Sequence, residues 1–290
     1  MPKIDRALLV CPTLNPGNMF EDWLAAYNRQ KIKPAAALII DSASSDGSVE
    51  NAKASGFIIN VIDREQFSHG GTRQRVVEEN EGYEFLIFLT QDAILSDSGA
   101  LSELLSAFED PEVAAVYGRQ LPRKDAGPVE AHARLYSYPA TAEIRTIKDA
   151  AKLGIKAAFL SNSFAAYRRE ALMEIGGFPK DVIFGEDMYA AANLLLAGYK
   201  VAYAAEACVY HSHNYTLLQE FERYFDMGVF HARDPWIRRE FGEADGEGLK
   251  FVVSELKYLS RHAFWKIPES LLRTVLKYIG FRLGMMEKHI

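Results

Sequence analysis

Four short apolar runs in the first hundred residues constrain the fold more than any other feature of this chain. They cover residues 7–11, 36–40, 57–62 and 85–89, and the stretches between them carry helical patterns and capping signals. Strands of about five residues that alternate with helices form parallel sheets covered on both faces. The sequence therefore predicts an α/β fold with a Rossmann-like, mainly parallel central sheet flanked by helices.

Polar residues follow three of these predicted strands directly. Thr13 comes after the first strand, Asp41 after the second and Asp92 after the fourth. In open α/β sheets ligands gather at the carboxyl ends of the strands. We therefore expect these three residues, which are distant in sequence, to converge on one site.

A second polar group lies in the other half of the chain. Glu186 and Asp187 begin a predicted helix over residues 186–197, and a predicted strand over residues 199–210 leads to His211 and His213. Together with Asp92, these groups indicate a metal ion and a separate base. Each group also has a purely structural explanation when it is considered alone. Acidic residues stabilise helix N-termini, and a lone histidine is structural about as often as it is a metal ligand.

The order of the motifs resembles that of the family 2 inverting glycosyltransferases with the GT-A fold, and within them the bacterial rhamnosyltransferases. The motifs that carry this resemblance are Pro-Thr-Leu-Asn at 12–15, Asp-Ser-Ala-Ser-Ser-Asp-Gly at 41–47, Phe-Ser-His-Gly-Gly-Thr-Arg at 67–73, Thr-Gln-Asp-Ala at 90–93, Asn-Ser at 162–163, Gly-Gly-Phe at 176–178, Gly-Glu-Asp at 185–187 and His-Ser-His at 211–213. The resemblance implies a GT-A domain over residues 1–215, with a donor half at about 1–95 and an acceptor half at about 96–215. Residues 216–290 are then a C-terminal helical extension.

The resemblance also implies a metal site. The family carries an Asp-x-Asp motif after the fourth strand, and here Thr90-Gln91-Asp92 keeps only the second carboxylate. Asp92 is the implied ligand of Mn²⁺ or Mg²⁺, and His213, with His211 as a further candidate, completes the shell. Thr90 remains able to hydrogen-bond a ribose.

Further roles follow from the same resemblance. Asp187 corresponds to the general base that removes the proton of the acceptor hydroxyl, and Glu186 orients the acceptor or the base. The implied donor-binding residues are Thr13, Asp41, His69, Arg73, Thr90, Gln91 and Asp92. For His69, packing on Phe67 is an equal alternative. The implied acceptor-binding residues are Asn162, Ser163 and Arg223, the last on an aromatic helix that either walls the acceptor site or packs in the core.

Charge is distributed unevenly along the chain. The net charge is −6, but from Lys257 onward the sequence contains seven Lys and Arg residues and only two Glu residues. The acidic body argues against nucleic-acid binding, whereas the basic, amphipathic C-terminal helices favour a packing or dimer contact or an anionic membrane surface. We find no secretory signal and no membrane-spanning run, and Cys11 and Cys208 are expected to be isolated buried thiols. We therefore expect a cytoplasmic protein, with peripheral attachment to the inner face of the membrane as an open alternative.

The sequence thus predicts metal-dependent inverting transfer of L-rhamnose from dTDP-L-rhamnose to a saccharide or lipid-linked saccharide acceptor in bacterial surface polysaccharide synthesis, such as that of O-antigen. One alternative is a glycosyltransferase that uses another nucleotide sugar. Two others are a metal-dependent phosphohydrolase and a non-catalytic sugar-nucleotide-binding protein. A glycosylated product, a free sugar or no turnover would separate them.

Overall fold

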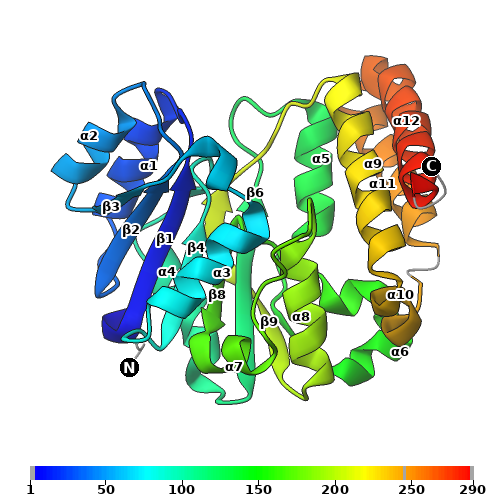
Figure 1. The fold of residues 1–290 in the computed structure, drawn as a ribbon. Coiled ribbons are helices and arrows are strands. Elements are labelled where there is room, and N and C mark those ends of the chain that lie inside the picture. The colour runs from blue at the N-terminus through cyan, green and yellow to red at the C-terminus, as the bar shows by residue number, and fades with distance from the viewer. Residues whose placement is uncertain (1–3, 244–245, 288–290) are drawn as a thin grey trace.

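A computed structural model describes residues 4–243 and 246–287; Lys288, which belongs to the basic C-terminal excess, lies outside these residues. Within them a nine-stranded sheet runs through the molecule, with helices on both faces (Figure 1). The strands are β1 (Ala7–Thr13), β2 (Ala36–Asp41), β3 (Ile58–Val61), β4 (Phe85–Leu89), β5 (Ile94–Leu95), β6 (Val113–Leu121), β7 (Glu143–Arg145), β8 (Phe164–Arg168) and β9 (Lys200–Tyr210). The α-helices are α1 (Met19–Asn28), α2 (Ser48–Ala54), α3 (His69–Glu79), α4 (Ala100–Ser106), α5 (Pro128–Ser137), α6 (Ala150–Leu153), α7 (Arg169–Glu174), α8 (Glu186–Leu196), α9 (Leu217–Arg233), α10 (Pro235–Phe241), α11 (Glu247–His262) and α12 (Ile267–Met285).

The strand order is β3-β2-β1-β4-β8-β6-β9-β5, with β7 paired to β9. The first four strands pair in parallel, and Thr13 lies opposite Asp41 in the register of β1 and β2. β8 is antiparallel to both of its neighbours, β4 and β6, while β6 and β9 are parallel. The predicted α/β fold is confirmed, and the antiparallel strands lie in its second half.

Both faces of the sheet are buried, as the continuous apolar runs predict. Along β1, Leu8 and Val10 join a core with residues of α3, α7 and α8, whereas Leu9 and Cys11 join a second core with residues of α1 and α4. All five residues of β4 are buried. This central position of β4 places Asp92, three residues beyond its end, over the middle of the sheet.

The structure differs from the sequence prediction at several elements. The largely apolar stretch at residues 159–167 predicts a strand, but the strand begins only at Phe164, because Phe159 ends a 3-10 turn (Gly154–Ala158) and its N–H bonds to the carbonyl of Lys156. The pattern of residues 72–80 predicts a helix, but this helix already begins at His69, because the Ser68 hydroxyl accepts the N–H of Gly71 and caps it. Cys208 is only half-buried, and the central strand β6 lies where no strand was predicted.

The C-terminal helices α9, α11 and α12 stand beside α5 at one edge of the sheet (Figure 1). Glycines let α12 approach α9 closely: a Cβ at Gly280 would lie 2.6 Å from the carbonyl oxygen of Phe221, and one at Gly284 would overlap that of Phe225. The same layer buries an ion pair between Arg273 and Glu220, whose atoms are 2.7 Å apart. None of the helices in the described residues is long and apolar enough to cross a membrane.

The close approach of α9 and α12 predicts opposite effects for two alanine substitutions. Gly284→Ala drives a methyl group into the backbone of α9 and should lower the free energy of unfolding by about 1–3 kcal/mol. Gly248→Ala, in α11 with no atom within 4 Å of the added carbon, should be neutral or stabilise by up to about 1 kcal/mol. Urea unfolding of both variants measures the difference, and equal effects would contradict the close packing.

Candidate active site

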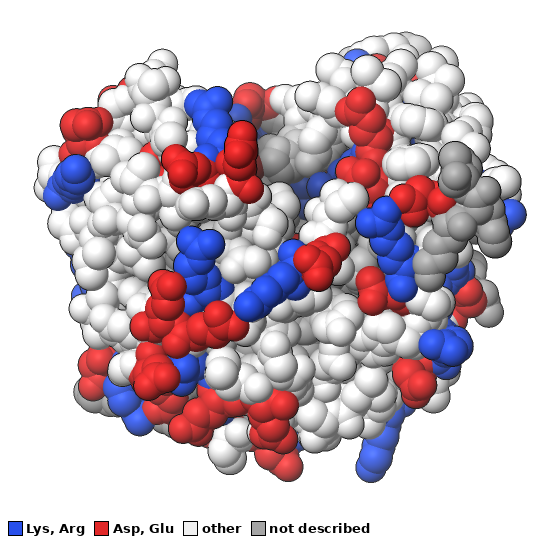
Figure 2. Space-filling view, viewed as in Figure 1, with Lys and Arg blue, Asp and Glu red and all other residues white. Residues whose placement is uncertain are grey.

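Two cavities open at the carboxyl ends of the central strands and share part of their walls. The first, of about 370 Å³, is lined by residues that follow β1, β2 and β4, including Thr13, Thr90 and Asp92. The second, of about 400 Å³, lies between the sheet and helices α5, α8 and α9. Ser163, His211 and His213 line both cavities, so they mark the junction. Figure 2 shows the molecular surface hollowed on this side, between the β1–β3 edge and the C-terminal helices.

Asp92, His211 and His213 meet at this junction. Their ligand atoms all lie within 4.8 Å of one another. The Nε2 atom of His211 is 3.3 Å from Oδ2 of Asp92, and the Nε2 atom of His213 is 3.5 Å from the same oxygen. His213 also stacks on Tyr215, with ring centroids 4.9 Å apart. The structure therefore brings together the three residues that the family resemblance implied as metal ligands.

Gln120 on β6 determines which nitrogen of His211 carries a proton. Its Oε1 accepts a hydrogen bond from Arg134 at 2.8 Å, and because arginine only donates, this atom must be the amide oxygen. The same oxygen lies 2.8 Å from Nδ1 of His211, so Nδ1 carries the hydrogen. In the neutral imidazole, Nε2 then presents a bare lone pair toward the carboxylate of Asp92.

The pKa shifts of the two histidines favour neutral imidazoles beside an ionised Asp92 at neutral pH. Burial lowers the pKa of His211, and burial together with the neighbouring His211 lowers the pKa of His213 to about 4. Burial opposes ionisation of Asp92, whereas the hydrogen bond that its carboxylate accepts from the Thr90 hydroxyl favours the charged form. A carboxylate oxygen and an imidazole lone pair facing each other at 3.3 Å repel unless a cation lies between them. The residues therefore fit a metal ion.

The ends of β1, β2 and β4 are tied together around the first cavity. The Thr13 hydroxyl donates to Asp41 at 2.8 Å, and the Thr90 hydroxyl donates to Asp92 at 2.7 Å. The amide of Gln91 bonds to both backbone groups of Leu14, which joins the end of β4 to that of β1. Asp41 is buried behind this wall, whereas Thr13, Thr90 and Gln91 line the cavity.

Arg73 connects the first cavity to the Glu186-Asp187 pair. Its guanidinium lines the cavity and forms a 3.0 Å ion pair with Glu186, and both side chains are buried. Asn162 connects this ion pair to Asp187, because its side chain donates a hydrogen bond to Glu186 and its backbone N–H donates one to Asp187. His69, which precedes Arg73 by one helical turn, lines the same cavity and packs edge-on against Phe67.

Asp187 faces the second cavity and has an unusual acidity. Burial and the negative charge of Glu186 raise its pKa to about 7. The pKa of Glu186 itself is lowered, because Arg73, His69 and the hydrogen bond from Asn162 together outweigh the effect of burial. The environments of two adjacent carboxyl groups thus push their pKa values apart, which is the usual arrangement for a general base beside a permanently ionised partner.

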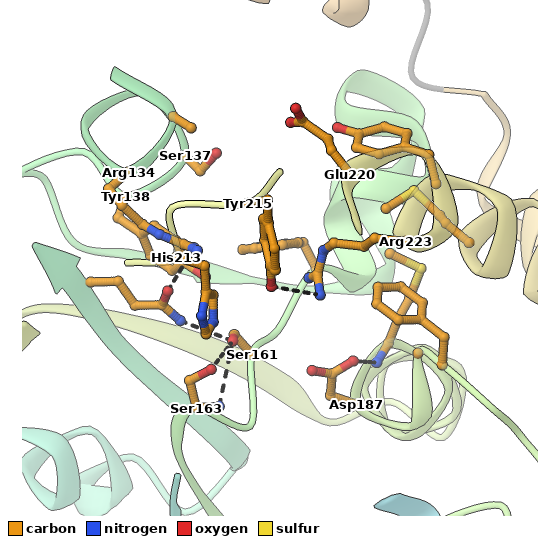
Figure 3. A pocket seen from close by; sticks show the side chains of 18 of the residues that line it. Arg134, Ser137, Tyr138, Ser161, Ser163, Asp187, His213, Tyr215, Glu220 and Arg223 are labelled. Carbon is orange, nitrogen blue, oxygen red and sulfur yellow. Dashed lines mark hydrogen bonds between the residues drawn. The ribbon is translucent and has the colours of Figure 1, made fainter. Parts of the chain in front are cut away.

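The walls of the second cavity come mainly from α5, α8 and α9. In Figure 3, Asp187 and His213 lie on two sides of the cavity, with Tyr215 and Arg223 between them. The Arg223 guanidinium stacks 5.0 Å above the ring of Phe184. On α9, Tyr224 and Phe230 line the cavity, whereas Phe221 and Phe225 contact α12, so the aromatic helix both walls the cavity and packs in the core. Ser163 lines the cavity, while Asn162 and Glu186 are buried behind it.

Sequence reasoning missed Gln120, Arg134 and Tyr215. Arg134 lines the second cavity with Gln120, and Tyr215 stacks on His213. Gln120 and Arg134 lie on either side of a proline-containing stretch that shows no strand pattern, and neither residue belongs to a recognisable sequence motif. Tyr215 lies two residues after His213, just as His213 lies two residues after His211. This spacing of two was the only feature of the sequence that could have indicated that Tyr215 lies beside the histidines.

Comparisons with known proteins agree with this geometry. Residues 9–176 match the family described as glycosyl transferase family 2. The chain is 49% identical over 277 residues to the O-antigen chain rhamnosyltransferase WbaN of Salmonella anatum, and 50% identical to RfbN of Salmonella typhimurium, in each case over 95% of this chain and 88% of the relative. Among solved structures, the mannosyltransferase PcManGT from Pyrobaculum calidifontis, in complex with GDP-Man and Mn²⁺, has a TM-score of 0.60 at 18% identity, over 92% of this chain and 73% of its own. TarS residues 1–349 from S. aureus have a TM-score of 0.56 at 11% identity, over 98% and 91%.

The buried pair of Arg73 and Glu186 predicts a coupled loss of stability. Arg73→Met leaves Glu186 buried without its counter-charge and should lower the free energy of unfolding by about 3–5 kcal/mol. The double variant Arg73→Met/Glu186→Gln should lose clearly less than the sum of the two single variants. Urea unfolding of the four proteins of this cycle measures the coupling, and additive losses would contradict a direct pair.

Proposed function

Since the chain belongs to glycosyl transferase family 2 and has the GT-A fold that its sequence predicted, we propose that it transfers L-rhamnose from dTDP-L-rhamnose, with inversion, to a saccharide or lipid-linked saccharide acceptor. The chain is a glycosyltransferase, and the names of its two relatives, both O-antigen chain rhamnosyltransferases, support rhamnose as the sugar and O-antigen as the product.

One observation carries the proposal: a cluster of Asp92 with two histidines, which fits a cation, and a carboxyl group of raised pKa line two cavities that meet. Inversion requires that the acceptor hydroxyl attack the anomeric carbon from the face opposite the leaving diphosphate. A donor in the first cavity, with its diphosphate at Asp92, would present its sugar at the junction. An acceptor in the second cavity then approaches from the side of Asp187.

The metal belongs to the proposed donor site. Asp92, His211 and His213 would hold it, and a carboxylate with two imidazoles suits Mn²⁺ better than Mg²⁺, which prefers oxygen ligands. When bound, the ion supplies positive charge that stabilises the leaving diphosphate. Gln120 acts as a positioning residue, because its amide oxygen holds His211 with Nε2 turned toward Asp92.

Asp187 is the proposed catalytic base. As the acceptor oxygen forms its bond to the anomeric carbon and the bond from that carbon to the diphosphate breaks, the hydroxyl proton passes to the Asp187 carboxylate. Glu186 is too buried to touch the acceptor; it keeps its negative charge beside Arg73 and raises the pKa of its neighbour. Asn162 holds both carboxylates in place.

The remaining predicted residues take roles by position. We assign the nucleotide to Thr13, Thr90, Gln91 and the donor half at residues 1–95, with Arg73 and His69 nearer the sugar and the diphosphate. Asp41, predicted to contact the nucleotide, is buried behind the wall and instead holds the Thr13 hydroxyl. Ser163 and Arg223 are assigned to the acceptor. In this scheme the division at residue 215 separates the GT-A domain from the extension at 216–290, which supplies one wall of the acceptor cavity.

Products of turnover separate this proposal from its alternatives. Incubation with dTDP-L-rhamnose, Mn²⁺ and an acceptor should yield a glycoside, whereas a phosphohydrolase yields free sugar and a binding protein yields nothing. Asp187 is hydrogen-bonded to backbone N–H groups and faces the other cavity, so it does not add a ligand to the Asp92 cluster as a hydrolase would need. A panel of other nucleotide sugars tests the identity of the donor.

Replacement of the proposed base predicts loss of transfer without loss of donor binding. Asp187→Asn should lower kcat by about 100- to 10,000-fold, because an amide accepts no proton from the acceptor. In the unaltered enzyme, kcat/KM should fall as the pH drops below about 7, since Asp187, whose pKa is raised to about 7, then becomes protonated. Initial rates measured between pH 5 and 9 check both expectations.

Donor affinity and a neighbouring carboxylate supply the controls. Calorimetry should show that Asp187→Asn binds dTDP with Mn²⁺ as the unaltered enzyme does. Asp181→Asn, an exposed position six residues upstream, should retain transfer. Loss of nucleotide binding in Asp187→Asn, or full activity of that variant, would refute the assignment.

A further inference from the structure

The solvent-facing side of α12 is apolar along its whole length. Seven large hydrophobic residues, each at least 42% exposed, follow one another there at spacings of one to four residues: Leu271, Leu272, Val275, Tyr278, Ile279, Leu283 and Met286. Such spacing places them on one side of a helix. A helix at the surface of a soluble protein normally turns charged and polar residues outward. We call this row the α12 stripe.

The opposite side of α12 is committed to the protein body. Gly280 and Gly284 are buried against the backbone of α9, and Arg273 is buried in its ion pair with Glu220. A rotation of α12 that buried the stripe would expose these groups and drive larger side chains into α9. The stripe therefore faces outward because of the packing of the helix.

Aromatic side chains extend the apolar surface at the start of α12. Phe264 and Trp265, in the 3-10 turn Phe264–Lys266, are 68% and 64% exposed, and Leu249 and Val253 on α11 are also exposed. Figure 2 shows few charged side chains over this edge, at the upper right. An apolar surface of this extent on a soluble protein marks an interaction site.

The exposed charges of α11 and α12 that have no ion-pair partner all have one sign. Arg282 follows Tyr278 and precedes Met286 by four residues each, so it lies within the stripe, and Lys257 and Arg261 are exposed on α11. Among the described residues, none forms an ion pair with these three. Of the acidic residues on α11 and α12, Glu269 pairs with Lys266, Glu247 pairs with Lys156, and Glu255 is buried away from the surface.

We propose that the α12 stripe docks on a phospholipid bilayer that contains anionic lipids, with α12 lying in the plane of the interface. Basic residues beside apolar ones, with Trp and Tyr among them, suit such a surface. A second copy of the chain suits it less, because a two-fold contact through the stripe would bring Arg282 close to its own copy. Charge complementarity thus selects the anionic bilayer.

Docking in this orientation has a consequence for the acceptor. Phe251 on α11 and Lys277 on α12 line the cavity that contains Asp187, so the acceptor cavity borders the helices that would contact the bilayer. A lipid-linked saccharide would then reach the site without leaving the membrane. This consequence rests on the proposed function, whereas docking itself does not.

Flotation with vesicles tests the docking. The full chain should float with vesicles of phosphatidylcholine and phosphatidylglycerol, and less so as the salt concentration rises. Val275→Glu should weaken binding by more than about tenfold, since it places a charge in the stripe, and Arg282→Gln should weaken it by about fivefold. Val61→Glu is the matched control, because Val61 on β3 is 58% exposed, against 53% for Val275, and should bind as the unaltered chain does.

The outcomes separate docking from its alternatives. Failure of the unaltered chain to float at low salt, or equal loss in Val275→Glu and Val61→Glu, overturns the proposal. A dimer in sedimentation velocity that Val275→Glu dissociates also overturns it, in favour of a contact between copies. Thermal unfolding confirms that the variants fold, and because flotation needs neither donor nor metal, failure of the proposed function leaves this result intact.

Discussion

The ion pair between Arg73 and Glu186 is the interaction on which the rest of the site depends. Arg73 comes from α3 in the proposed donor half and Glu186 from α8 in the proposed acceptor half, so the pair fixes one cavity relative to the other. It also keeps Glu186 ionised, and that charge contributes to the raised pKa of Asp187. A single buried contact thus sets both the position and the acidity of the proposed base.

The metal site depends on an equally specific constraint. Arg134 fixes the amide of Gln120, Gln120 fixes the tautomer of His211, and the bare Nε2 of His211 then faces Asp92. The Thr90 hydroxyl holds the other oxygen of Asp92. Thr90 stands where the family carries the first carboxylate of the Asp-x-Asp motif, and in the proposed site two histidines provide the ligands that this carboxylate does not. The proposed preference for Mn²⁺ follows from that replacement.

Much of this architecture was predictable from sequence because its signals are local. The strands β1, β2 and β4 are continuous apolar runs, and the residues at their ends converge as parallel topology requires. β6 was not predictable, because its apolar part, Val-Ala-Ala-Val-Tyr, is short and the rest, Gly-Arg-Gln-Leu, contains a glycine and two polar residues that do not mark a strand. Gln120 and Arg134 were missed with it. Glu186 and Asp41 are buried behind the cavity walls and do not line the cavities. Their burial depends on tertiary packing, which cannot be predicted from the spacing of residues in the sequence.

The central claim is that a metal binds at the junction of the two cavities while Asp187 remains free to act as a base. Anomalous diffraction from crystals grown with Mn²⁺ and dTDP tests it most directly. The account predicts a single peak bonded to Asp92 and the histidine pair, with the diphosphate on the donor side and Asp187 uncoordinated. A peak bonded to Asp187 or Glu186, or no peak at Asp92 with the nucleotide bound, would contradict it.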